Sequence, residues 1–274
     1  MSDVNYKDKL DKITYQENKI IKACKNNCDD GYIYTDEEDD EVLLHPKRNL
    51  CDCRNKFYKV LNYILANVPR IFWYKNKFDD IECREYLFEK EKLGRVKKFK
   101  PIYDKFISNK KLVLDNGFSF LFSGMNGTGK TYTSANMIKS FVDCGYDYCY
   151  YIHFRELLDY YYKGIIGRDK TNRDMFNYII KADLLCIDEI GKENNATTVV
   201  LGEFEYWLKT RLESNKSTIL ITNRSLIKKD DASDFLSSYG ESIWDIFKQT
   251  WRLFVFNPSS DFRLKDRKNW SILK

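Results

Sequence analysis

Gly124-Met-Asn-Gly-Thr-Gly-Lys130-Thr131 matches the pattern G-x-x-x-x-G-K-[ST] at every fixed position. The apolar run 118–122 precedes this stretch, and a helical pattern near 129–143 follows it. Glycines let successive backbone N–H groups turn toward phosphate oxygens, and the helix that follows points its positive end at the same anion. The alternative interpretation is a chance glycine-rich turn, which the order of strand, loop and helix disfavours. The stretch therefore predicts a phosphate-binding loop.

The residue types in this loop indicate ATP with Mg²⁺ as the ligand. Lys130 is expected to reach the β and γ phosphates, and Thr131 is expected to offer its hydroxyl to Mg²⁺. The predicted nucleotide-binding residues are Gly124, Asn126, Gly127, Thr128, Gly129, Lys130, Thr131, Tyr132 and Asp188.

A second motif, Leu184-Leu-Cys-Ile-Asp188-Glu189, is an apolar run that ends in two acids. A buried strand of this kind places its last carboxylates at the sheet edge beside the phosphate loop. We predict that Asp188 holds Mg²⁺ through water and that Glu189 orients and deprotonates an attacking water. Two adjacent acids favour ATP hydrolysis, which disfavours a small-molecule kinase. The alternative is an ordinary acidic loop at a strand end.

A third apolar run, Thr218-Ile-Leu-Ile-Thr222-Asn223, also ends in polar residues. Asn223 is predicted to hydrogen-bond the γ-phosphate or the attacking water, although a strand followed by asparagine is also an ordinary turn. The predicted catalytic residues are Glu189, Lys130 and Asn223.

From residue 112 onward, short apolar runs alternate with longer helical patterns. This alternation predicts an α/β fold with a parallel sheet covered on both faces. We divide the chain into a helical, zinc-binding module at 1–66, a basic helical connector at 67–111 that is broken at Pro101, and an ATPase domain at 112–274. The expected strands are 118–122, 148–152, 184–187, 218–222 and 253–256, and the expected helices are near 5–23, 57–65, 129–143, 154–163, 171–181, 198–214 and 232–250.

Cys24, Cys28, Cys51 and Cys53 form two close pairs in an otherwise polar part of the chain. Two such pairs on two turns can converge on a tetrahedral Zn²⁺, and Gly31 would permit the tight turn of a zinc knuckle. His45 is a possible substitute ligand. Four unrelated thiols are the alternative, and disulfides are disfavoured by the reducing compartment expected here.

Basic residues gather between Lys90 and Lys111, where they interleave with three aromatic residues. Cations there would neutralise phosphates and aromatics would stack on bases, as in single-strand binding surfaces. The alternative, which we favour for the aromatics, is a solvated helix whose rings face the core. The residues concerned are Lys97, Lys98, Lys100, Lys105, Lys110, Phe99, Tyr103 and Phe106.

Composition excludes several classes of protein. The chain has 274 residues, 43% hydrophobic and 32% charged, with a net charge of +5, which is too mild to indicate nucleic-acid binding by itself. No run approaches the roughly 20 apolar residues of a membrane span. The polar segment Met1–Tyr15 does not resemble a secretory signal, so we expect a cytoplasmic protein without a membrane partner. The acidic run 36–41 is expected to be a solvated loop.

Together these motifs resemble the helicase loaders of the DnaC/DnaI type, which are AAA+ ATPases and are related to the IstB transposition helpers. The resemblance covers nearly the whole chain, and the cysteine module in front of the nucleotide motifs narrows it to this family. The matching elements are the cysteine pairs with Cys28-Asp-Asp-Gly31, Val68-Pro69, Gly124–Thr131, Asp188-Glu189, Thr222-Asn223 and Ser259-Ser260-Asp261-Phe262-Arg263.

The resemblance implies an AAA+ ATPase that loads the replicative hexameric helicase. It implies ATP, Mg²⁺ and Zn²⁺ as cofactors, single-stranded DNA as a partner, and self-association through the ATPase domains. The alternative function is an IstB-like, ATP-gated adaptor that binds duplex DNA and recruits a transposase or recombinase.

The sequence departs from this family at one point. Such loaders carry an R-V-x-D-R-L stretch that supplies an arginine finger in trans, whereas here the segment reads Ser242-Ile-Trp-Asp245-Ile-Phe247. Lys248 and Arg252 are possible substitutes, although only arginine presents a planar fork to a phosphate. Slow ATP turnover without a partner is therefore expected.

Overall fold

The chain divides into two compact units, Met1–Asn67 and Val68–Lys274. None of the helices that can be described has the length and apolar content that a membrane crossing demands. Four features of the sequence fall outside the described residues, namely Gly31, the acidic run 36–41, His45 and Ser259–Arg263. The computed structural model describes residues 3–26, 28, 29, 32–34, 48–74, 81–146, 148–192, 198–227 and 234–257.

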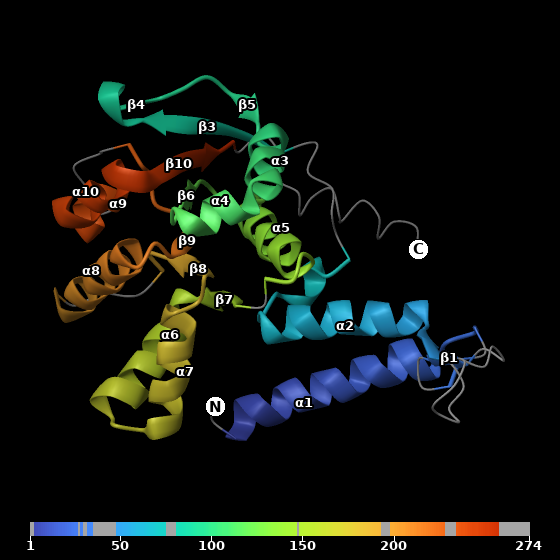
Figure 1. Ribbon diagram of the computed structural model, residues 1–274. Helices are drawn as coiled ribbons and strands as arrows, with labels where there is room; N and C mark the ends of the chain where they lie inside the picture. The colour runs from blue at the N-terminus through green and yellow to red at the C-terminus, as the bar shows by residue number, and fades with distance from the viewer. Residues whose placement is uncertain are drawn as a thin grey trace, which may run out of the picture. The chain divides into compact units, whose positions relative to one another are not determined.

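The first unit contains a pair of packed helices (Figure 1, blue and cyan). Helix α1 (Asp3–Glu17) continues into the π-helical turn η1 (Asn18–Lys22), and α2 spans Asp52–Leu65. Both expected helices of this region are therefore confirmed. Between them, β1 (Tyr32–Tyr34) pairs with β2 (Arg48–Leu50) in antiparallel fashion.

One apolar cluster of this unit surrounds the cysteines. Ile21, Cys51, Cys53 and Phe57 are buried together, and Cys24 and Cys28 pack against them half-buried. Two of the four cysteines are thus core residues as well as thiols. The thiols therefore form part of the packed interior of this unit.

The second unit is built on a mostly parallel sheet. Its strand order is β4-β3-β10-β6-β9-β8-β7, with β5 also paired to β3. The five strands from β10 to β7 are parallel, and β3 is antiparallel to β10. All five expected strands are confirmed. The bounds are β3 Glu82–Leu87, β4 Lys92–Leu93, β5 Lys97–Lys98, β6 Ser119–Ser123, β7 Cys149–His153, β8 Leu184–Ile190, β9 Ser217–Thr222 and β10 Trp251–Phe256.

Helices connect the parallel strands (Figure 1, green to red). The expected helical segments are confirmed, except that 232–250 forms two helices because Gly240 takes a φ of 84° between them. Strand β6 lies between β10 and β9, so the loop after β6 opens where the strand order reverses, which is where ligands bind in such sheets. The helices are α5 Lys130–Val142, α6 Phe154–Tyr161, η4 Tyr162–Ile166, α7 Lys170–Ile180, α8 Thr198–Glu213, α9 Phe235–Tyr239 and α10 Glu241–Thr250.

The expected basic helical connector at 67–111 is wrong in two respects. The short strands β3, β4 and β5 lie between its helical segments, and β3 extends the main sheet by pairing with β10, so the segment belongs to the second unit. Pairing with a strand about 170 residues later overrides local helical preference. Pro101 lies in the first turn of α3 (Lys100–Ser108), where its missing N–H costs nothing, so it begins a helix rather than breaking one. The remaining elements of this segment are η2 Arg70–Phe72, η3 Phe88–Lys90 and α4 Lys110–Asp115.

The aromatic and basic side chains of the segment 97–110 mainly make contacts within the protein. Phe99 and Phe106 are buried against the phenylalanines of β6 and β10, and the Tyr103 hydroxyl contacts Ser140. The expectation that these rings face the core is therefore confirmed. Three of the lysines pair with acids: Lys97 with Glu85, Lys98 with Glu82 and Lys100 with Asp104.

Candidate functional site

The predicted phosphate loop joins the centre of the sheet to the start of α5. Gly124 follows β6 with a φ of 140°, and a Cβ there would lie 2.8 Å from the carbonyl oxygen of Phe256, so only glycine fits. Gly127 and Gly129 also take positive φ values, 82° and 93°. These conformations turn the loop tightly around the N-terminus of α5, where backbone N–H groups are available to an anion.

Lys130 is nearly buried at the first position of α5. Its Nζ donates to the carbonyl oxygens of Gly124 at 2.6 Å and Met125 at 2.8 Å, and Thr128 Oγ1 donates to the same Met125 carbonyl at 2.9 Å. The ammonium therefore lies in the curve of the loop. Phosphate oxygens placed there would compete with these carbonyls as charge-assisted acceptors.

Thr131 of α5 hydrogen-bonds to Asp188 of β8 at the carboxyl ends of the parallel strands. Thr131 Oγ1 donates to Asp188 Oδ2 at 2.8 Å, and Asp188 is only 2% exposed. Because the threonine hydrogen goes to the carboxylate, the hydroxyl oxygen keeps its lone pairs for a cation. A hydroxyl and a carboxylate held this way suit Mg²⁺, which prefers oxygen ligands and retains several waters.

Two further groups hold Asp188 in place. The Tyr151 hydroxyl on β7 donates to Asp188 Oδ2 at 2.5 Å, and the backbone N–H of Glu189 donates to Oδ1 at 2.6 Å. Burial, together with the adjacent Asp188 carboxylate, raises the pKa of Tyr151, so its hydroxyl stays protonated. The sequence analysis missed Tyr151, because only the pairing of β7 with β8 brings it to this carboxylate.

Glu189 occupies an unusual backbone conformation. Its φ is 65°, and the β8–β9 register shifts between Ile187 and Ile190. Glutamate rarely adopts this region, and such outliers cluster at functional sites. The irregularity leaves the Glu189 side chain 45% exposed, paired with Lys192 and 3.9 Å from Nδ1 of His153. Sequence reasoning missed both neighbours, although His153 ends the strand beside Asp188.

The remaining predicted residues lie at the same edge or next to the loop. Asn223 is exposed directly after β9, whose Thr222 pairs in register with Ile190 of β8. Asn126 is exposed in the loop, and the Tyr132 ring lies edge-on to Phe72 with 5.7 Å between centroids. The fold thus brings the predicted phosphate, magnesium and water contacts to one sheet edge. Their roles remain predictions.

Replacing Glu189 with glutamine tests its predicted role as the base. Glutamine preserves the shape but cannot accept the proton, so we expect ATP binding to persist while phosphate release falls by roughly 10²–10⁴-fold. Bound ATP and released phosphate are measured on one preparation, with Glu203→Gln on α8 as the control. A normal rate of phosphate release from Glu189→Gln would place the base elsewhere.

The two proposed substitutes for an arginine finger are engaged elsewhere. Arg252 Nε lies 2.7 Å from Oε1 of Glu85 on β3, and its guanidinium covers the Phe254 ring. It pairs in register with Phe120, near the start of β6 and thus at the far end of that strand from the phosphate loop. Burial opposes ionisation of Glu85, but hydrogen bonds from Arg252 and Lys97 outweigh it and lower its pKa. Arg252 therefore fastens β3 to the sheet.

Lys248 is exposed and bonds Asp245 at 2.8 Å. The segment 242–247, where the resemblance predicts arginines, lies in α10, and its Ile243, Ile246 and Phe247 are buried in the core. Sequence reasoning also passed over Arg224, which directly follows Asn223. The Arg224 side chain lies close against Gly191, two residues after Glu189, where a Cβ would meet its Nε at 2.5 Å.

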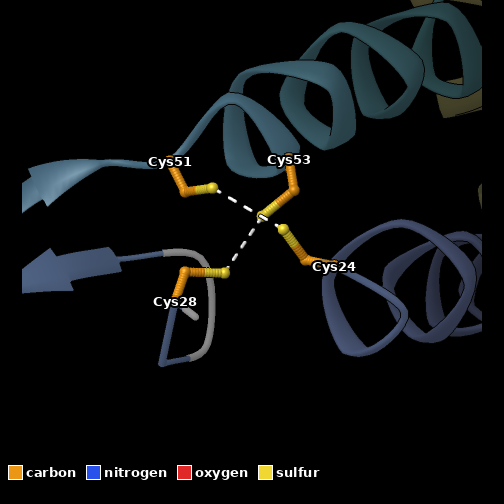
Figure 2. Close-up of side chains that lie close together, drawn as sticks. All are labelled: Cys24, Cys28, Cys51 and Cys53. Carbon is orange, nitrogen blue, oxygen red and sulfur yellow. Dashed lines mark hydrogen bonds between the residues drawn. The ribbon is translucent and has the colours of Figure 1, made fainter. Parts of the chain in front are cut away.

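The four cysteines of the first unit point toward one another (Figure 2). Their sulfur atoms all lie within 4.8 Å, with Cys24–Cys51 at 3.7 Å and Cys28–Cys53 at 3.6 Å. A tetrahedron with zinc–sulfur bonds of about 2.3 Å has sulfur–sulfur edges of about 3.8 Å. The same distances exceed a disulfide bond of about 2.05 Å. The cluster could therefore hold a zinc ion, and it supplies four thiols without His45.

The position of Cys51 favours its thiolate, because Cys51 directly precedes α2, where the helix dipole favours negative charge. Cys53 lies in the first turn of α2, but burial raises the pKa of its thiol. The backbone N–H of Cys53 lowers the pKa of Cys51 to about 7, against the opposing effect of burial. The Asn26 side-chain amide also donates to Cys51 Sγ at 3.7 Å. Sequence reasoning missed Asn26, whose contact is of the kind that orients metal ligands.

Comparison with known proteins finds similarity only to solved structures, and that similarity is distant. No protein-family model matches the chain, and no curated protein matches it. Among solved structures, the DnaC helicase loader is 21% identical with a TM-score of 0.49, covering 57% of this chain and 87% of its own. DnaI is 16% identical with a TM-score of 0.46, covering 62% and 90%. Domain III of the Thermotoga maritima replication initiation protein DnaA is 20% identical with a TM-score of 0.46, covering 68% and 74%.

These likenesses concern architecture. The expected α/β fold with a mostly parallel sheet is confirmed by the strand order and pairing. The similar solved structures include DnaC and DnaI, the type of loader that the sequence resemblance named, and also a DnaA initiator, which it did not name.

Proposed function

We propose that this chain is an ATP-dependent loader of a replicative hexameric helicase, which binds and hydrolyses ATP and contacts single-stranded DNA. The observation that carries the ATPase part is the meeting of Lys130, Thr131, Asp188 and Glu189 at one sheet edge, around a loop shaped by positive-φ glycines. The loader part rests on the order of a four-cysteine module followed by this nucleotide site.

In the proposed reaction each residue has one task. Lys130 would exchange its loop carbonyls for β and γ phosphate oxygens, and Thr131 and Asp188 would hold Mg²⁺, which would supply positive charge at the phosphates. Glu189 accepts the proton of the attacking water, and Asn223 orients that water or the γ-phosphate. Lys192 contacts only Oε1 of Glu189, so Oε2 remains available to the water.

ATP would act mainly as a switch in this proposal. Arg252 is bonded to Glu85, and Lys248 to Asp245, so neither is a ready arginine finger. A finger contributes about 10³–10⁵-fold in rate, so the missing cation accounts for roughly 4–7 kcal/mol of transition-state stabilisation. Subunits associated through their ATPase domains would then hydrolyse ATP slowly until a partner supplied the missing cation.

The test is steady-state ATP hydrolysis against protein concentration, alone and with the hexameric helicase, single-stranded DNA or both. We expect slow turnover alone and a rise of at least about 10-fold with the partners. Arg252→Ala should hydrolyse like wild type while losing about 1 kcal/mol of stability or less, because its ion pair is half exposed. Lys248→Ala should also match wild type.

Two outcomes would contradict the proposal. Brisk hydrolysis by the protein alone, climbing with concentration and collapsing in Arg252→Ala or Lys248→Ala, would mean that the finger is present. Failure to copurify with a hexameric helicase, together with tight binding of duplex DNA, would favour the adaptor of a transposase or recombinase.

A further inference from the structure

Asp188 has nearly all of its acceptor capacity occupied by this chain's own donors. Thr131 Oγ1 and the Tyr151 hydroxyl both donate to Oδ2, and the Glu189 backbone N–H donates to Oδ1. A carboxylate offers about four lone-pair sites, so one site on Oδ1 remains. The orientation of that last acceptor is set by the three donors together.

Two of those donors belong to the nucleotide motifs, and Tyr151 does not. Tyr151 reaches Asp188 from β7, the neighbouring parallel strand, in which His153 pairs in register with Asp188. Its side chain is 1% exposed, with the His153 ring edge-on at 5.6 Å. A rigid, buried ring ending in a hydroxyl donor fixes the carboxylate more firmly than water would.

We propose that Tyr151 is the positioning residue for the magnesium site, acting through Asp188. The proposal rests on the proposed function, because it assumes that Asp188 faces the cation that accompanies ATP. With both lone pairs of Oδ2 taken, only Oδ1 can face a metal-bound water. Without the Tyr151 hydroxyl, one lone pair of Oδ2 is also left without a donor. The carboxylate can then rotate about its side-chain bond and present either oxygen to the metal-bound water. Groups that orient metal ligands typically change metal affinity by about 10–100-fold when removed.

The test compares Tyr151→Phe with Tyr150→Phe in the full-length protein. Each variant removes one hydroxyl from a tyrosine that is 1% exposed, and the two side chains face opposite sides of β7. Binding of a fluorescent ATP analogue is titrated with Mg²⁺, and binding without the metal is measured in chelator. We expect Tyr151→Phe to raise the Mg²⁺ midpoint about 10–100-fold while metal-free binding is unchanged. Tyr150→Phe should keep the wild-type midpoint.

A purely structural role predicts something different. In that case both variants would lower the melting temperature and neither would shift the Mg²⁺ midpoint. That result would overturn this inference and leave the proposed function standing. A shift of equal size in both variants would overturn it too. If wild type binds no ATP analogue at any Mg²⁺ concentration, the proposed function and this inference both fall.

Discussion

Stripping the metal from the cysteine cluster unfolds the first compact unit and leaves the second folded; this is the largest effect that we expect. Cys51 and Cys53 are two of the four buried members of the apolar cluster around the thiols. Structural zinc supplies about 10–16 kcal/mol to zinc-finger peptides, so loss of the ion from a unit this short should unfold it. The sheet of the second unit has its own extensive core, so it should not depend on the ion.

The measurement is elemental analysis of metal-replete protein, followed by hydrogen exchange before and after chelation. We expect one zinc ion per chain, and loss of amide protection confined to the segment before Val68 once zinc is removed. Cys53→Ser should reproduce the loss, whereas Cys144→Ser, at an exposed cysteine of the second unit, should not. Zinc-free protein that keeps full protection in α1 and α2 would contradict this account.

The site was predictable where a motif is local. The phosphate loop has every fixed residue within eight positions, and each predicted strand that ends at the site is a continuous apolar run. Parallel strands align their carboxyl ends, so Asp188 and Asn223 could be placed at one sheet edge before any coordinates. The four cysteines could be grouped for a similar reason, because they form close pairs.

What the sequence did not reveal depends on long-range pairing. Strand β3 is defined by its partner β10, and its sequence has no clear alternation, so the local pattern predicts a helix there. The contact of Tyr151 with Asp188 spans 37 residues, and that of Arg252 with Glu85 spans 167. The positive φ of Glu189 follows from a register shift between β8 and β9, which no local pattern signals.

Lys130→Ala should abolish useful ATP binding, because the lysine is the principal charge at the phosphates. Each hydrogen bond to a charged group contributes about 1.5–3 kcal/mol, so loss of contacts to two phosphates weakens binding by roughly 10²–10⁴-fold. Lys130 also bonds two loop carbonyls, so some loss of stability accompanies the change. Lys130→Met, which fills the same space without charge, serves as a second variant. Lys181→Ala, at an exposed lysine that follows α7, is the matched control.

The central claim is that this sheet edge binds ATP, and equilibrium titration of ATP with Mg²⁺ tests it most directly. Wild type, Lys181→Ala and both Lys130 variants are compared after thermal melting shows which are folded. The account predicts tight binding by wild type and Lys181→Ala, and binding weakened at least about 100-fold in whichever Lys130 variant is folded. Unchanged ATP affinity in a folded Lys130 variant, or no binding by wild type, would contradict it.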